Sequence, residues 1–179
     1  SSYIQRPPGM GFIHLVFYKI SPELYPILHK LFALFLHALA LYFFGLMALE
    51  LLGQRGAIFA QLAYALLPCF WGYLFYYLTE SITPSFMVFL FYGYVKYHLW
   101  SSSRWLIFQA FIGGILIMIR PQLICFIFPF IYFMIHFLKN KNFKKWSVFT
   151  VVLLLAFGGF ISWQIRSATI AKRFTGLHG

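Results

Sequence analysis

The sequence predicts an all-α membrane protein, a bundle of about six transmembrane helices preceded by a short helix on the membrane surface. Two features of the composition predict it, since 62% of the 179 residues are hydrophobic and only 9% are charged. Soluble domains carry about 25% charged residues. The third observation is that uncharged runs of spanning length recur along the chain. A lipid bilayer is therefore the expected environment.

The charged residues narrow the classes of function. Fourteen Lys and Arg face only three acids, and no Asp occurs, so a complete hydrolase with paired carboxylates is excluded within these residues. The basic residues are spread singly between apolar runs, which favours anionic lipid headgroups or lipid phosphates over nucleic acid as partners. Cys69 and Cys125 lie in apolar runs without metal-ligand spacing, and we expect them to act as small hydrophobic residues.

Residues 1–26 are predicted to form an outer juxtamembrane segment. Arg6-Pro7-Pro8-Gly9 predicts an extended chain. Residues 10–20 then form an apolar, aromatic helix that is too short to cross a bilayer, and we expect it to lie along the membrane surface. Ser21-Pro22-Glu23 ends that helix and is expected to supply the cap, the first-turn proline and the first-turn acid of the next one, whose regular part Pro26 delays. The chain opens without Met or a signal peptide, which predicts an excerpt of a longer protein.

Residues 27–166 are predicted to form the six-span bundle, and residues 167–179 the start of an outer loop. A spanning helix needs about 20 apolar residues, with a range of about 17 to 25. The uncharged runs that match this requirement, some of them short, are 31–49, 56–79, 81–95, 105–119, 121–138 and 146–165.

Two of these stretches are too long for one crossing and must break. Residues 105–138 would extend about 51 Å as one helix, against a hydrocarbon core of about 30 Å. Arg120-Pro121 supplies the break. In residues 56–94 the break comes from Pro68 and from the polar step Thr79-Glu80-Ser81 before Pro84.

The orientation of the bundle follows from its basic residues. Lys and Arg are balanced between alternate sides of the six spans, but Lys139 to Lys145 is the densest short cluster. By the positive-inside rule we expect this loop to be cytoplasmic. Both ends of the chain then lie on the outer side.

Arg120 is a candidate site residue because of its expected depth. The run 105–119 covers only about 22 Å of helix and stops short of the opposite interface. A charge at that depth costs at least a few kcal/mol unless it faces a watery or anionic cavity. Two interpretations stay open: an interfacial arginine that snorkels, or a cation that faces a cavity beside a proline break.

Glu80 has the same two kinds of interpretation. It either caps the helix that starts near Pro84, or orients a sugar hydroxyl or pairs with Arg120 on the same outer side. His37, in mid-span, is expected to be a hydrogen-bonded packing residue. Gly158-Gly159, like Gly113-Gly114, is expected to permit close approach of helices.

The order of short motifs resembles the dolichyl-phosphate-mannose protein mannosyltransferase-like family of the GT-C glycosyltransferase superfamily. The resemblance covers nearly all of the chain. In the last motif Ser167 stands where the family usually has Asn. The motifs that carry the resemblance are Arg6-Pro7-Pro8-Gly9 with residues 12–20, the turn Leu52-Gly53-Gln54-Arg55-Gly56, Leu78-Thr79-Glu80, Ile117-Met118-Ile119-Arg120-Pro121 and Ser162-Trp163-Gln164-Ile165-Arg166-Ser167.

The resemblance implies transfer of a sugar from a polyprenyl-phosphate donor to a lipid, glycan or protein, with inversion at the sugar carbon, on the outer face of a bacterial inner membrane. The family's catalytic acid lies in an outer loop that would precede Ser1, and its usual C-terminal part would follow Gly179. We therefore expect these 179 residues alone to transfer no sugar.

The resemblance also implies roles for particular residues. Arg6, Arg120 and Arg166 would bind the lipid-linked phosphate. Lys19 is a fourth candidate, although an amphipathic surface helix would carry a lysine regardless. Glu80 is the candidate substrate-orienting acid. Some relatives use a divalent metal, and no ligand set for one is visible in the sequence.

The rival class is a lipid-glycan flippase or another transporter fragment without transferase chemistry, and a scaffold subunit without a site is the third class. Transporters also tolerate intramembrane arginine and helix breaks. They tend to show repeated halves, and this sequence shows no internal repeat.

Overall fold

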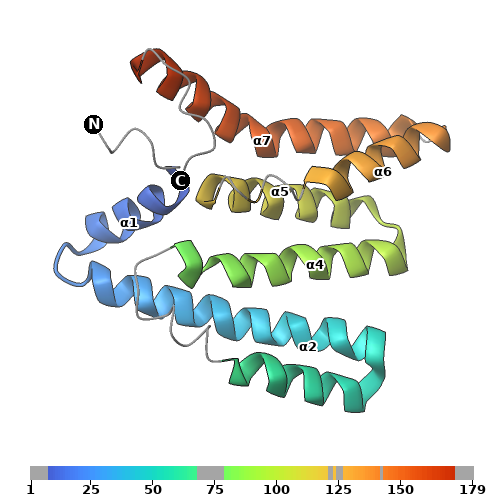
Figure 1. Ribbon diagram of the computed structural model, residues 1–179, viewed down its shortest axis with the longest axis horizontal. Helices are drawn as coiled ribbons and strands as arrows, with labels where there is room; N and C mark the ends of the chain where they lie inside the picture. Colours follow the sequence, from blue (N-terminus) through green and yellow to red (C-terminus); the bar gives the residue numbers. More distant parts are fainter. Residues whose placement is uncertain (1–7, 68–78, 121–122, 124–126, 142, 172–179) are drawn as a thin grey trace. The chain divides into compact units, whose positions relative to one another are not determined.

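The computed structural model describes residues 8–67, 79–120, 123, 127–141 and 143–171. In these ranges every regular element is helical, which confirms the predicted all-α class. The chain divides into two compact units, Met10–Val95 and Ser1–Gly9 with Lys96–Gly179. The elements, shown in Figure 1, are α1 (Pro8–Ile20), α2 (Tyr25–Leu66), the 3₁₀ turn η2 (Thr79–Ser81), α4 (Thr83–Trp100), α5 (Ser103–Ile119), α6 (Ile127–Lys139) and α7 (Phe143–Ala171).

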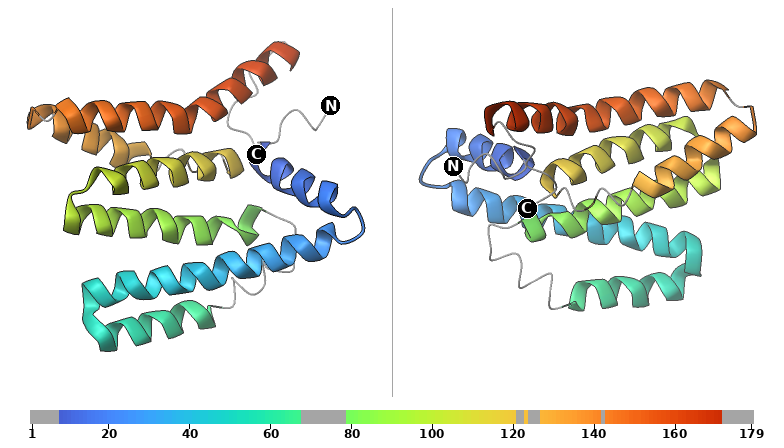
Figure 2. Two further views of the ribbon diagram at one scale, coloured as in Figure 1. Left: turned by 180° about the vertical axis from the view of Figure 1, so that it is seen from behind. Right: turned by 45° about the horizontal axis from the view of Figure 1, so that its top comes forward.

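Helix α2 is a hairpin of two arms, residues 25–52 and 54–66, that reverse at Gly53. The φ of 72° and ψ of −177° at Gly53 form a combination that is essentially restricted to glycine. Gln61 Nε2 donates a hydrogen bond of 3.4 Å to the carbonyl oxygen of Leu41. The rings of Phe44 and Tyr64 lie 5.1 Å apart, so the arms pack side by side, as both Figures 1 and 2 show. This reversal confirms the turn predicted at residues 52–56.

Helix α2 also carries the clearest membrane signal. Within the described ranges it is the one helix that is long and apolar enough to cross a bilayer, while α5 is apolar but has only 17 residues. The other predicted spans correspond to α4, α5, α6 and α7, and their crossing stays a prediction. The break predicted at Pro68 lies outside the described residues.

Helix α1 packs against the start of α2 through aromatic rings. The rings of His14 and His29 lie 4.9 Å apart, and those of Phe17 and Phe32 lie 5.5 Å apart. Burial lowers the pKa of the His14 imidazole below its ordinary value of 6.5, which favours the neutral form of this ring beside His29. The helix predicted at residues 10–20 is confirmed as a helix. It already starts at Pro8, so the extended conformation predicted for Pro8 and Gly9 is wrong.

The turn between α1 and α2 differs in one respect from the prediction. Ser21 Oγ accepts a hydrogen bond of 3.3 Å from the Leu24 backbone N–H. Helix α2 itself begins at Tyr25, with Pro26 in its first turn. Ser21 therefore caps the short turn, and Pro26 takes the first-turn position that was expected for Pro22.

In the same unit, α4 packs against the first arm of α2. The ring of Phe43 lies 5.6 Å from that of Phe89 and 4.8 Å from that of Tyr92. Val88 and Leu90 on α4 are buried. This interface aligns residues 37–43 of α2 with the first half of α4.

The other unit is built on α7, against which both α5 and α6 pack (Figure 2). Its buried cluster consists of Ile117 with Phe157 and Phe160, and Met118 and Trp163 are packed at its edge. A Cβ on Gly159 would lie 3.6 Å from Met118 Sδ, and one on Gly158 would meet nothing within 4 Å. The expectation that Gly158-Gly159 permits close helix approach is therefore wrong.

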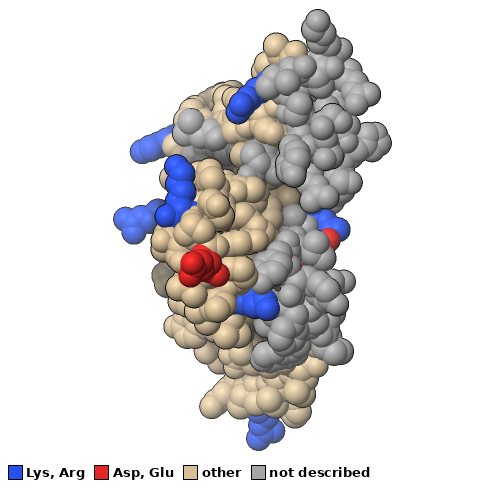
Figure 3. Space-filling model, turned by 90° about the vertical axis from the view of Figure 1, so that its left-hand side faces the viewer, with Lys and Arg blue, Asp and Glu red and all other residues tan. Residues whose placement is uncertain are grey.

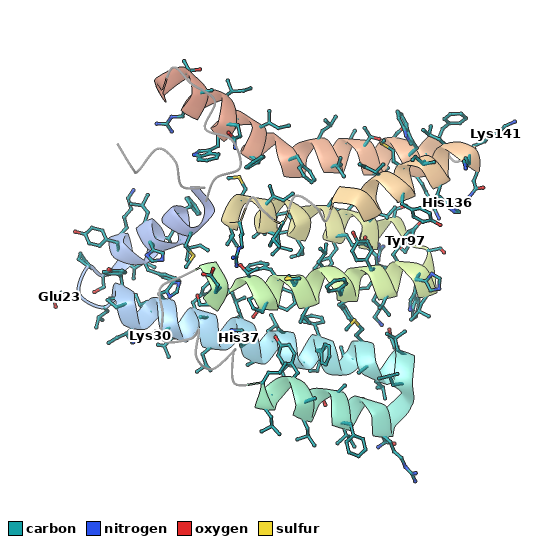
Figure 4. The ribbon with its side chains drawn as sticks, in the orientation of Figure 1. Glu23, Lys30, His37, Tyr97, His136 and Lys141 are labelled. Atoms are coloured by element: carbon teal, nitrogen blue, oxygen red, sulfur yellow. The ribbon has the colours of Figure 1, made fainter. Side chains whose placement is uncertain are left out.

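One end of this unit holds a basic turn. Lys145 Nζ donates a hydrogen bond of 2.9 Å to the carbonyl oxygen of Ser101, just before α5, and lies 5.9 Å from the Tyr97 ring centre. Asn140 Nδ2 and His136 Nε2 are 2.9 Å apart in the α6–α7 turn. Figure 4 shows Lys141, His136 and Tyr97 at this end.

Candidate functional site

The helix break predicted at Arg120-Pro121 is confirmed. Helix α5 ends at Ile119, and Arg120 has extended backbone angles, φ −144° and ψ 97°. Its N–H donates to the Leu116 carbonyl oxygen at 2.8 Å, and its own carbonyl oxygen accepts from the Leu123 N–H at 3.0 Å. Both backbone groups of Arg120 are thus bonded within the protein, which fixes the backbone from which the guanidinium projects.

The residues that precede Arg120 in α5 are apolar and buried. Ile117 and Ile119, in the last turn of α5, are only 2% and 1% exposed, while the Arg120 side chain is partly buried. A partly buried guanidinium beside such residues is less screened by water than one on an open surface. An anionic group that reached it would therefore bind more strongly than at an exposed arginine.

Gly9 brings the start of α1 against the same turn of α5. A Cβ on Gly9 would lie 2.6 Å from the Met118 carbonyl oxygen and 2.9 Å from the Ile119 nitrogen. These are backbone atoms, so only glycine fits at this position without a shift of the chain. Arg6, which precedes Gly9 by three residues, lies outside the described residues.

This role of Gly9 was not predicted from the sequence, although Pro-Pro-Gly contributed to the resemblance. The available signal was a glycine at the start of an apolar helix, directly after two prolines. Glycine is a poor helix former, so its presence there indicates a steric requirement.

Helix α7 supplies the third segment. Its residues Phe160 and Trp163 pack around Ile117 and Met118 of α5. Arg166 follows Trp163 by three residues, and its side chain is exposed. Gly9 at the start of α1 and the α7 residues Phe160 and Trp163 therefore both pack at the last turn of α5.

The remaining predicted site residues belong to the other unit. Lys19 is exposed at the end of α1, and Glu80 is partly buried in η2. A pairing of Glu80 with Arg120 stays a prediction. Within the described ranges there is no group of three or more His, Cys, Asp or Glu side chains that could hold a metal ion.

The charge distribution agrees with separate roles for separate cations. Among the described atoms on the face in Figure 3, basic side chains stand singly or in small groups on a largely uncharged surface. Each cation is therefore best interpreted from its own neighbours.

Comparison with known proteins supports the resemblance found in the motifs. Residues 5–163 match the family model described as dolichyl-phosphate-mannose-protein mannosyltransferase. The matched range includes Arg6, Glu80 and Arg120, and Arg166 lies three residues beyond it. No curated protein matches the chain, and no solved structure matches it.

Proposed function

The chain belongs to the dolichyl-phosphate-mannose-protein mannosyltransferase family, and from this premise we propose that it transfers a sugar from a polyprenyl-phosphate donor to a lipid, glycan or protein on the outer face of its membrane. Membership and the apolar helix α2 indicate a membrane glycosyltransferase in general. The observation that carries the finer proposal is Arg120, a partly buried cation on a fixed backbone where three segments of one unit converge.

The chemistry of such a donor explains why a cation is needed. The polyprenyl chain stays in lipid, so its phosphate lies near the interface. When the bond between sugar and phosphate breaks, negative charge grows on the departing phosphate, and a fixed cation stabilises that charge in the transition state. A guanidinium suits this role because its planar fork contacts two phosphate oxygens at once.

The other predicted cations have supporting roles in this proposal. Arg6 and Arg166 would extend the phosphate site from the N-terminal segment and from α7, and Lys19 is the fourth candidate. Glu80 would orient a hydroxyl group of the sugar by accepting its hydrogen bond.

The test compares the full-length wild type with Arg120→Ala and Arg120→Lys at matched protein levels in the same membranes. A charge-assisted contact is worth about 1.5 to 3 kcal/mol, so Arg120→Ala should lower donor-dependent transfer efficiency by roughly 10 to 150-fold. Arg120→Lys should recover only part of the loss, because an ammonium is a single compact charge. Equal activity in all three proteins would remove Arg120 from the site.

The same assay separates the transferase from the rival class. A flippase would move the labelled polyprenyl-phosphate sugar across a vesicle membrane without forming a glycosylated product. Donor-dependent product formation therefore supports the proposal, and lipid movement without product contradicts it.

We also propose that the lysine turn faces the cytoplasm and that the site faces the outside of a bacterial inner membrane. Support comes from α5, because Lys145 contacts Ser101 just before its start and Arg120 follows its end. A cysteine at Asn140, in a protein otherwise free of cysteine, should react with a membrane-impermeant reagent only after permeabilisation. Labelling in intact cells would mean that the orientation is the reverse of the one proposed and that the site faces the cytoplasm.

A further inference from the structure

A group of buried polar side chains in the unit Met10–Val95 has no role in the phosphate site. Ser81 and Ser85 are 0% exposed, and His37 is 9% exposed. A buried hydroxyl or imidazole without a compensating hydrogen bond costs a few kcal/mol. Such groups persist in an apolar bundle where their hydrogen bonds are made, and these bonds then fix a particular arrangement of the chain.

The contacts show which arrangement is fixed. His37 Nδ1 and Ser85 Oγ are 3.2 Å apart in a buried hydrogen bond between α2 and α4. Ser85 lies in the first turn of α4, and only Ile82 separates this helix from η2. One side chain of α2 thus holds the first turn of α4 and, through it, the end of η2. Figure 4 marks His37 on the first arm of α2.

Glu80 lies directly before Ser81 in the chain and five residues before Ser85. It is the middle residue of η2, a three-residue turn. A 3₁₀ turn of this length has weak hydrogen bonding of its own. Its position therefore depends on neighbouring contacts, and the next residues, Ser81 and Ile82, are both 0% exposed.

We infer that His37 is a positioning residue, whose imidazole holds η2 and so fixes the carboxylate of Glu80 for contact with a hydroxyl of the donor sugar. The inference rests on the proposed function, because it requires Glu80 to touch the sugar. Precise placement matters for such a contact, since a displacement of about 1 Å can lower a rate by about 100-fold.

A purely structural role for His37 predicts something different. If the ring only filled space between α2 and α4, phenylalanine would replace it with little effect on transfer. If it only stabilised the fold, the losses caused by changes at His37 and Glu80 would multiply, because independent sites contribute additively to free energy.

The experiment is a double-mutant cycle on the full-length protein in membranes. We expect His37→Phe to lower donor kcat/KM roughly 10-fold, within the range for a misplaced binding group. Glu80→Gln should lower it by at least as much, and the double variant should be no worse than Glu80→Gln alone. His37→Asn should retain most of the activity, because its side-chain amide can occupy the place of Nδ1.

Two further variants keep the test independent of folding. Ser85→Ala removes the same hydrogen bond from the α4 side, and it should couple to Glu80→Gln as His37→Phe does. Leu36→Ala is the matched control, since Leu36 is a buried apolar neighbour on α2. It should lower stability, and its effect on transfer should multiply with that of Glu80→Gln.

Each result has one meaning. Wild-type kcat/KM in both His37→Phe and Ser85→Ala, or multiplicative losses in the double variant, would overturn the positioning role while leaving the transferase proposal intact. Full activity of Glu80→Gln would overturn the inference and the orienting role of Glu80, without affecting Arg120. Absence of donor-dependent transfer by the wild type would overturn the proposed function itself.

Discussion

The two ends of α5 use basic residues in different ways. At its start, the ammonium of Lys145 donates to a backbone carbonyl and lies over the Tyr97 ring. At its end, the partly buried Arg120 extends from a fixed backbone beside Ile117 and Ile119. The first arrangement joins α7 to the α4–α5 turn, and the second places a cation directly after buried apolar residues. The difference teaches that a cation's neighbours indicate its role more than its charge does: an anchor for Lys145 and, in our proposal, a phosphate ligand for Arg120.

The lysines around the first end fit the anchoring role. Lys139, Lys141 and Lys144 are exposed on or near the α6–α7 turn, in contrast to Arg120. Long cationic side chains of this kind reach lipid headgroups while their stems cover apolar surface. We therefore expect changes at the two ends of α5 to separate into effects on stability and effects on transfer.

Apart from changes of Arg120 itself, the largest effect is expected from Gly9→Ala. The new methyl group would overlap the backbone of Met118, so the start of α1 must move away from the end of α5. We expect transfer efficiency to fall by about 10 to 100-fold with expression maintained, which is the cost of a displacement of about 1 Å. Gly11→Ala is the control, because a Cβ there meets nothing within 4 Å. Wild-type transfer by Gly9→Ala would separate this segment from the site.

A smaller effect, on stability alone, is expected from Gly53→Ala. The turn in α2 requires a backbone conformation that costs other residues about 1 to 3 kcal/mol. The free energy of unfolding in detergent should fall by that amount, while transfer per folded molecule stays unchanged. Gly158→Ala, in open space on α7, should not lower stability. A loss of specific activity in Gly53→Ala would show that this turn also contributes to the site.

The smallest effect is expected from Lys145→Met. The substitution removes an exposed hydrogen bond and a cation–aromatic contact, and such surface interactions are worth at most about 1 kcal/mol. Thermal unfolding should shift slightly, and donor-dependent transfer should remain at the wild-type level. Lys144→Met, on the neighbouring exposed position, provides the comparison. If Lys145→Met lowered transfer as strongly as Arg120→Ala, the distinction between the two ends would be lost.

The positions of helices and breaks could be predicted because they depend on local properties. The lengths of uncharged runs located the described helices, and glycine and proline chemistry located the reversal at Gly53 and the break at Arg120. Each described helix overlaps its predicted run, but the ends differ by about six residues at the start of α2 and at the end of α7, and the second arm of α2 ends at Leu66 instead of residue 79. The shift of the α2 start to Tyr25 arose because two prolines, Pro22 and Pro26, offered the same first-turn signal.

The contacts that build the site could not be predicted in the same way. Gly9 meets Met118, and His37 meets Ser85, across long separations in sequence. A single sequence contains no signal that pairs such residues, because their contact depends on how helices pack. His37 was correctly expected to be a hydrogen-bonded packing residue, but its partner Ser85 was not predicted. Arg120 was identified because a charge beside a proline break is unusual in an apolar chain.

The contact between Gly9 and Met118 has a consequence for biosynthesis. The two residues are separated by about 110 positions, and synthesis proceeds at about 5 to 20 residues per second from the N-terminus. The N-terminal segment therefore emerges roughly 5 to 20 seconds before the backbone that receives it. During that interval the preceding helices can enter the bilayer while this segment is still undocked. The contact between Gly9 and Met118 would thus form only after α5 has been synthesised, so under the proposed function a chain that ends before α5 would lack the phosphate site.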